Sequence, residues 1–220
     1  MYIIIVGAGP IGTGLAELAL EEQHNVVIVE ANEARARKAL QQYDLQVLHA
    51  DIAERGIMDE ANAGRADALI ATTEDDKVNL MAVSLAREYG IKTLISTVNT
   101  EGHEVLFERV GVNILNDPHM VVAEHLYGFL RYPEYEGIIP LVGGKHAFKL
   151  TLGEEAPLAG RLLSDAMDGE LLPEGLLIVL LQRGDEVLVP AGDTRLQAGD
   201  RLTLLADEPI ADDHLKAFTG

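Results

Sequence analysis

The residue pattern with the clearest chemistry in this sequence is a glycine-rich loop near its start. The run Gly7-Ala8-Gly9-Pro10-Ile11-Gly12 directly follows an apolar stretch and opens a helical pattern. Gly7 permits a tight turn, Gly9 lets the backbone approach a pyrophosphate, and Gly12 lets the helix pack closely on the strand. The first helical turn offers free N–H groups and a partial positive charge to an anion. The pattern therefore predicts a loop that binds the phosphates of a nucleotide.

An acidic residue lies where such a loop would need a partner for the ribose. Glu30 ends the second apolar run, and a carboxylate there can accept hydrogen bonds from both ribose hydroxyls. The same carboxylate would repel a 2′-phosphate, so NADP is disfavoured. The alternative interpretation is a tight strand–helix turn without a ligand, with Glu30 exposed.

Three further loops should open onto the same crevice, because the carboxyl ends of parallel strands meet at one edge of a sheet. Asp51 could bond an adenine amino group, and Thr72 and Thr73 could line the pyrophosphate or the second ribose. Asp76 is interpreted as a helix cap, followed by Asn79 in the first turn. The loops are residues 49–52, 72–76 and 98–99.

Residues for catalysis are hard to find. Hydride transfer needs an acid–base group beside the nicotinamide, yet Tyr127 is followed at the Tyr-x-x-x-Lys spacing by Arg131. His119 and His125 are not at the i, i+4 spacing of a helical metal pair. We therefore assign no catalytic and no metal-ligating residue and expect a binding protein, not an enzyme. The alternative is a small NAD-dependent oxidoreductase with a substrate site between domains.

Strand and helix patterns alternate through the first half, which predicts a parallel sheet with right-handed crossovers. Strands are expected at residues 2–6, 26–29, 45–48, 68–71, 93–98 and 112–115. Helices are expected at 11–22, 33–43, within 54–63, at 76–89 and at 101–110.

The rhythm changes after Pro118, which can begin a helix that Pro133 stops. Strands are then expected at 147–152, 176–182, 186–189 and 201–205, with a linker at 134–138 and short helices at 160–167 and 209–218. The predicted fold class is α/β: a Rossmann-like doubly wound parallel sheet with a second, smaller α+β domain. The first domain spans 1–133, including a crossover helix at 118–132, and the second spans 138–220.

Charge and composition exclude several classes of partner. The formal net charge is −19, which nucleic-acid phosphates and anionic lipid would both repel. The longest apolar run, residues 176–181, is far shorter than the roughly 20 residues of a membrane span. The first residues are interpreted as a strand, not a signal peptide, and the absence of cysteine excludes disulfides and thiolate zinc sites. We expect no nucleic-acid partner and no membrane insertion.

Residues 1 to about 133 resemble the N-terminal domain of the Trk/Ktr-type potassium-uptake regulators, also called the regulator of potassium conductance domain. Residues from about 138 onward resemble that family's C-terminal domain. In the first half the matching runs are residues 3–12, 29–32, 50–51, 71–73, 76–79 and 111–112 with Pro118. In the second half they are residues 157–163, 183–185 and 189–202, the last being the more specific run.

The resemblance implies a cytosolic regulator that docks on a membrane potassium-translocating subunit, at the inner face of the cell membrane. It implies a homo-oligomer, a dimer of dimers or a larger ring, in which nucleotide binding gates ion flow. Ala8 stands where some ATP-preferring relatives carry an arginine, so NAD(H) is expected, with ATP or ADP possible. His119 stands where some relatives carry an acid that helps hold a cation, which argues against a bound divalent ion. The acidic stretch 165–174 argues against a cyclic dinucleotide.

The residues expected at the nucleotide follow from the motifs and the resemblance together. They are Gly7, Ala8, Gly9, Pro10, Ile11 and Gly12 at the phosphates; Glu30, Ala31 and Asn32 at the ribose; Arg35 at phosphate or adenine; Asp51 and Ile52 at adenine; and Thr72, Thr73 and Val98 lining the crevice. The helix at 118–132 carries an apolar face that could pack on a partner's Rossmann domain or on its own sheet.

Overall fold

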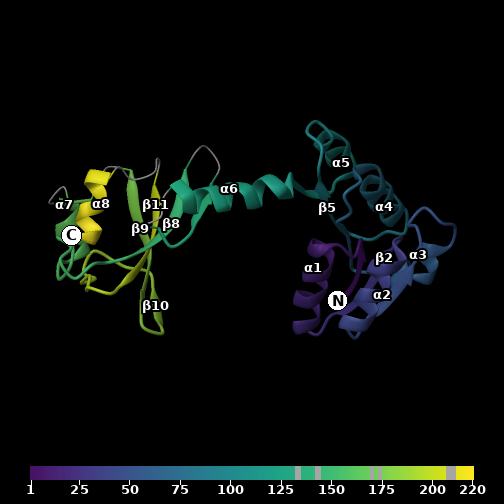
Figure 1. Cartoon of the computed structure of the whole chain (residues 1–220), viewed down its shortest axis with the longest axis horizontal. Helices are drawn as coiled ribbons and strands as arrows, with labels where there is room; N and C mark the ends of the chain where they lie inside the picture. The colour runs from purple at the N-terminus through teal and green to yellow at the C-terminus, as the bar shows by residue number, and fades with distance from the viewer. Residues whose placement is uncertain (132–134, 142–144, 169–170, 173–174, 207–211) are drawn as a thin grey trace. The chain divides into compact units, whose positions relative to one another are not determined.

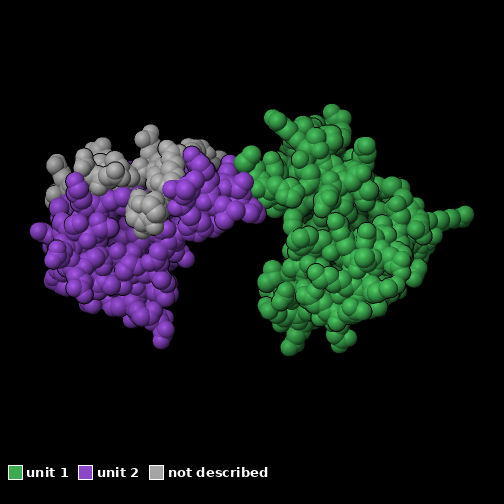
Figure 2. Space-filling view, viewed as in Figure 1, with its two compact units in different colours: residues 1–120 green, residues 121–220 purple. Residues whose placement is uncertain are grey.

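The computed structural model divides the chain into two compact units, residues 1–120 and 121–220, which Figure 2 colours separately. The structure describes residues 1–131, 135–141, 145–168, 171–172, 175–206 and 212–220. Each unit has its own hydrophobic core.

The first unit is built on a six-stranded parallel sheet in the order β3-β2-β1-β4-β5-β6. This order reverses direction beside β1, as a doubly wound Rossmann sheet requires, so the predicted fold class is confirmed. The strands are β1 (Tyr2–Val6), β2 (Asn25–Glu30), β3 (Gln46–His49), β4 (Ala68–Ala71), β5 (Thr93–Val98) and β6 (Asn113–Asn116). The helices are α1 (Pro10–Glu21), α2 (Glu33–Gln42), α3 (Ile57–Glu60), α4 (Asp76–Glu88) and α5 (Glu104–Val110), with a 3₁₀ turn η1 at Ala63–Arg65. Figure 1 labels the helices α1 to α5.

Helices cover both faces of this sheet, which explains why β1 is apolar at successive positions. Ile3 and Ile5 pack with Ala16 of α1 and with residues of α2 on one face. Ile4 and Val6 pack in the core that includes residues of α4 and α5 on the other. The glycine loop and the starts of α1, α2 and α4 therefore lie at one edge, beyond the carboxyl ends of the strands.

The helix α6 (Pro118–Arg131) contains the division between the units. All of it except the first three residues belongs to the second unit, where His125 Nδ1 lies 3.0 Å from the carbonyl oxygen of Ile138. A Cβ built on Gly128 would lie 2.8 Å from Ile138 Cγ2, so this glycine allows the helix to approach β7. The domain boundary that the sequence suggests, after this helix, stays a prediction.

The second unit is a five-stranded antiparallel sheet in the order β10-β9-β11-β8-β7. The linker expected at 134–138 ends at Ile138, which is the first residue of β7; this strand is only three residues long and is not among the expected strands. The strands are β7 (Ile138–Pro140), β8 (His146–Thr151), β9 (Leu176–Arg183), β10 (Glu186–Leu188) and β11 (Arg201–Ala206). The helices are α7 (Leu163–Asp168) and α8 (Asp212–Thr219); the start expected at 209 for the last helix lies outside the described residues.

An ion pair between a buried aspartate and a partly exposed arginine joins the end of β9 to the start of β11. The Asp200 carboxylate is almost fully buried and accepts two hydrogen bonds from Arg183, both at 2.8 Å, and one from the Gln197 N–H at 2.7 Å. Among the described residues, no helix is long and apolar enough to cross a bilayer.

Candidate functional site

The glycine loop has the strained and close-packed geometry that its sequence predicts. Gly7 has a φ of 103°, in the left-handed region that favours glycine. A Cβ on Gly12 would lie 1.9 Å from the carbonyl oxygen of Gly7 and 2.9 Å from Thr72 Oγ1. Gly12 therefore allows α1 to begin directly against the end of β1.

Gly9, unlike Gly7 and Gly12, has neither a positive φ nor an internal contact that requires glycine. It is the N-cap of α1, with φ −74° and ψ −177°, an extended conformation that any residue adopts. A Cβ there would meet no protein atom within 4 Å. The loop thus leaves an open cradle above the first turn of α1, where the N–H groups of Ile11 and Gly12 have no partner within the helix. Phosphate oxygens fit such a cradle.

Glu30 is buried, with 7% of its surface exposed, so the interpretation as an exposed residue is wrong. One carboxylate oxygen accepts the N–H of Ala8 at 2.6 Å and the other accepts the N–H of Asn32 at 2.7 Å. Glu30 therefore ties the glycine loop to the start of α2. Each oxygen keeps a further lone pair, so the ribose role stays a proposal.

The residues after Glu30 are engaged in building the start of α2. Asn32 caps this helix by accepting the N–H of Arg35 at 3.0 Å. The guanidinium of Arg35 lies 3.7 Å from the Glu74 carboxylate, on the loop after β4. Ala31, an exposed residue, offers its carbonyl oxygen to the ring of His49 at 3.1 Å.

The predicted adenine and crevice residues do not all face the open edge. Asp51 is exposed, and its side chain accepts the N–H of Ala53 at 2.9 Å. Ile52 and Val98, by contrast, are buried within the core cluster of the unit. Thr72 is also buried, with its hydroxyl 3.2 Å from the Val6 carbonyl oxygen.

Asn79 connects the loops that follow β4 and β5. Its side chain is fully buried. The amide oxygen accepts the N–H and the hydroxyl of Thr73 at 3.0 and 2.6 Å, and the amide nitrogen donates to the carbonyl oxygen of Thr97 at 3.2 Å. Thr73 is thereby fixed in position at the edge of the sheet.

The prediction that Asp76 caps α4 is wrong. The cap of α4 is Asp75, which accepts the N–H of Lys77 at 2.8 Å. Asp76 is 6% exposed and accepts the N–H groups of Asn99 and Thr100 at 2.8 and 2.9 Å. With two adjacent aspartates, local spacing could not say which one faces inward.

The Asp76 carboxylate also lies 2.9 Å from the ring nitrogen of His103. Burial alone would raise the pKa of Asp76, but the hydrogen bonds from Asn99, His103 and Thr100 outweigh it and hold that pKa below its ordinary value. The charged carboxylate therefore fixes the loop after β5 at neutral pH.

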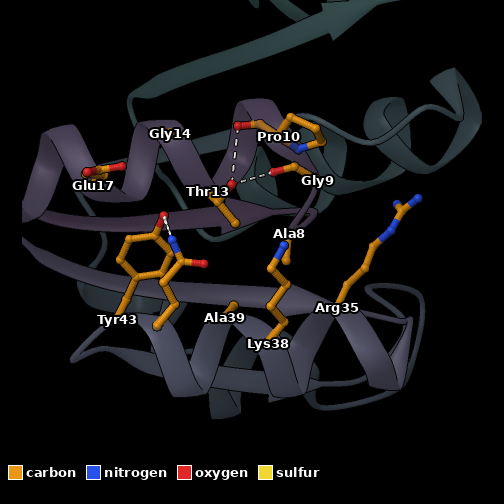
Figure 3. A pocket seen from close by; sticks show the side chains of 11 residues that line it. Ala8, Gly9, Pro10, Thr13, Gly14, Glu17, Arg35, Lys38, Ala39 and Tyr43 are labelled. Carbon is orange, nitrogen blue, oxygen red and sulfur yellow. Dashed lines mark hydrogen bonds between the residues drawn. The ribbon is translucent and has the colours of Figure 1, made fainter.

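Two hollows lie at this edge of the first unit. The larger, about 480 Å³, is bounded by the glycine loop, α1 and α2 (Figure 3). This hollow brings together four of the predicted site residues, Ala8, Gly9, Pro10 and Arg35. Its lining also includes Lys38, which is not among the predicted site residues. The smaller, about 180 Å³, lies at the ends of β5 and β6 and includes Val98 and Asn99. No group of three or more acidic or histidine side chains within the described part of the chain is placed to hold a metal ion.

Comparison with protein families finds two matches. Residues 3–118 match the TrkA-N domain and residues 148–218 match the TrkA-C domain. A Trk system potassium uptake protein TrkA homolog from Methanothermobacter thermautotrophicus is 26% identical over the whole of both chains. The Trk system potassium uptake protein TrkA of Azorhizobium caulinodans is 32% identical over 96% of this chain and 45% of its own.

Solved structures show the same fold. The GsuK channel bound to NAD matches 93% of this chain and 37% of its own, with a TM-score of 0.60 and 19% identity. GsuK bound to ADP matches 60% of this chain and 34% of its own, with a TM-score of 0.51 and 19% identity. This chain thus spans well under half of these channel chains.

Proposed function

The chain belongs to the TrkA family, defined here by its TrkA-N and TrkA-C domains, and on that premise we propose that it is a cytosolic nucleotide-binding regulatory subunit of a membrane potassium transporter or channel. A relative named for potassium uptake aligns with it from end to end. The relatives are named for potassium uptake and not for a reaction, which favours the regulator over the oxidoreductase that the sequence left open.

The single observation that carries nucleotide binding is the open cradle at Gly9. At Gly12 there is no room for a Cβ, because the backbone of Gly7 lies too close. At Gly9, by contrast, a Cβ would meet no protein atom within 4 Å. Gly9 also stands at the position of the glycine loop where the backbone approaches a pyrophosphate, so its open surroundings support a ligand there. The N–H groups of the first turn of α1 would hold its phosphates.

The ligand we propose is NAD(H), with ATP or ADP as the other candidates. The structural neighbours named above are described as bound to NAD and to ADP. Glu30 would turn its remaining lone pairs to the ribose, and Asn32 and Asp51 would lie on the ribose and adenine side. The buried residues Ile52 and Val98 would support the crevice from beneath.

Assembly into a homo-oligomer is supported by α6. Seven of its large hydrophobic side chains are exposed in the single chain, Leu130 by 77%. A face of this kind is too apolar to be left in water, and a second copy of the helix would bury it. The seven are Met120, Val121, Val122, Leu126, Tyr127, Phe129 and Leu130.

Gating requires that the nucleotide bind two shapes of the assembly with different affinity, because a ligand shifts an equilibrium only by its differential affinity. A coupling free energy of about 1–3 kcal/mol is typical of such systems. Asn79 and Asp76 fix the loops after β4 and β5, so a ligand held at this edge would act on elements that are already rigidly connected.

The test is a thermal-shift series on the purified chain with NAD, NADH, ATP, ADP and NADP, read together with its native mass. We expect NAD(H) or ADP to raise the melting temperature, NADP to have little effect, and the mass to be at least twice the 23.8 kDa of one chain. A protein that ignores every one of these nucleotides would refute the proposal. Co-purification with a membrane-spanning potassium-translocating subunit would support the regulatory role.

A further inference from the structure

The groove between α1 and α2 is continuous with the glycine loop. It begins at Ala8, Gly9 and Pro10 and extends along α1 past Gly14, where a Cβ would meet nothing within 4 Å. The facing wall of α2 includes Ala39. Small residues on both walls leave a hollow of about 480 Å³, large enough for phosphate groups that extend beyond the loop.

The groove also gathers positive charge on a strongly acidic protein. Two of its side chains are cations, Arg35 and Lys38, and one, Glu17, is an acid. The formal net charge of the chain is −19, so two cations beside a phosphate-binding loop contrast with the surface around them.

The three cations of α2 are not equivalent. Arg37 pairs with Glu33 at 2.6 Å, one helical turn away. Arg35 lies 3.7 Å from Glu74 and points away from the other side chains of the groove (Figure 3). Lys38 extends from α2 toward the loop at Ala8 (Figure 3), and no hydrogen bond or ion pair joins it to any residue that the structure describes.

The carboxylate of Glu30 limits where an anion can bind at the glycine loop. It already accepts the N–H of Ala8 at 2.6 Å. This amide is therefore not free to bind a phosphate, and a negative charge lies next to it. A phosphate beside Glu30 would be repelled. The free N–H groups of the first turn of α1 and the ammonium of Lys38, which extends toward Ala8 (Figure 3), offer positive charge to a phosphate instead.

We infer that the groove between α1 and α2 is a phosphate subsite, with Lys38 as its cationic contact, for an adenine nucleotide that carries at least a diphosphate. The inference rests on the proposed function, because it requires a nucleotide at the glycine loop. It adds that the length of the phosphate chain, and not the base alone, determines how tightly a nucleotide binds.

The experiment measures calorimetric affinities of adenosine, AMP, ADP and NAD for the full chain and for two variants, Lys38→Gln and Lys92→Gln. Lys92 is the matched control, since it is exposed just before β5, at the amino-terminal edge of the same sheet. We expect Lys38→Gln to weaken ADP and NAD about tenfold, as a lost charge-assisted hydrogen bond does, and to leave adenosine unchanged. Lys92→Gln should bind all four ligands as the unmodified chain does.

Each outcome separates the inference from the proposed function. If the unmodified chain binds no nucleotide, the proposed function fails. If it binds them and Lys38→Gln binds ADP with the same affinity, only the subsite is refuted. An equal loss in Lys92→Gln would also refute it, because the effect would then be one of total charge.

Two further variants guard against a folding defect. Lys38→Arg keeps the charge and should retain most of the ADP affinity, whereas a loss as large as that of Lys38→Gln would contradict the inference. Glu17→Gln removes the acid of the groove and should strengthen ADP binding severalfold, with adenosine again unchanged. Melting temperatures without ligand should agree among all these variants, because Lys38 and Glu17 are exposed.

Discussion

Replacing Gly12 by alanine should lower the stability of the protein, whereas replacing Gly9 by alanine should lower its affinity for a nucleotide. In Gly12→Ala the new Cβ would lie 1.9 Å from the Gly7 carbonyl oxygen, so α1 must move away from β1 by more than an ångström. Overpacking of this kind costs about 1–3 kcal/mol or more, which corresponds to a fall in melting temperature on the order of 10 °C. In Gly9→Ala the Cβ meets no protein atom, and the backbone conformation suits alanine.

The expected loss in Gly9→Ala is therefore in binding. Alanine is a poorer N-cap than glycine by less than about 1 kcal/mol, a shift of only a few degrees. The methyl group would occupy the place where a phosphate approaches the first turn of α1, so the affinity for NAD(H) or ADP should fall at least about tenfold. Differential scanning calorimetry of the ligand-free chains and isothermal titration with each nucleotide measure the two effects separately.

The reasoning would be refuted by either crossed result. Gly9→Ala with undiminished nucleotide affinity would show that no ligand approaches that backbone. Gly12→Ala with the melting temperature of the unmodified chain would show that α1 does not need its close approach to β1.

Three further substitutions test other contacts. Glu30→Gln should lose about 1–3 kcal/mol of stability, because an amide group would face the N–H of Ala8 or Asn32, and should weaken nucleotide binding; unchanged affinity by calorimetry would contradict the ribose role. Asp76 has a lowered pKa, so its stabilisation is present above about pH 4 and is lost as the pH falls through the depressed folded-state value. Asp76→Asn should therefore melt lower at pH 7 and show a flatter dependence on pH below about 4; an unchanged profile would argue against this role. Arg183→Ala leaves buried Asp200 without its bidentate partner and should lower the free energy of unfolding by about 2 kcal/mol, measured by urea denaturation. This is less than for a fully buried pair, because 37% of the arginine side chain is exposed. An unshifted urea midpoint would contradict this.

Local patterns in the sequence were enough to predict the Rossmann-like sheet and its loop. The alternation of apolar runs with helical spacing follows from burial on both faces of a parallel sheet, as Ile3 and Ile4 show by packing into different cores. Gly7 and Gly12 could be assigned their turn and close-packing roles because both are consequences of a strand that passes directly into a helix. These features depend on residues that are neighbours in the chain.

The tertiary structure decided what the side chains at the edge of the sheet contact. Glu30 holds the N–H of Ala8 from another strand, and Asp76 holds the loop at Asn99 and Thr100 instead of capping its own helix. Lys38 lies in the groove because α1 and α2 pack on the same face of the sheet. Such contacts join segments that are far apart in the sequence, and their geometry depends on how the helices pack, which no local spacing of residues encodes.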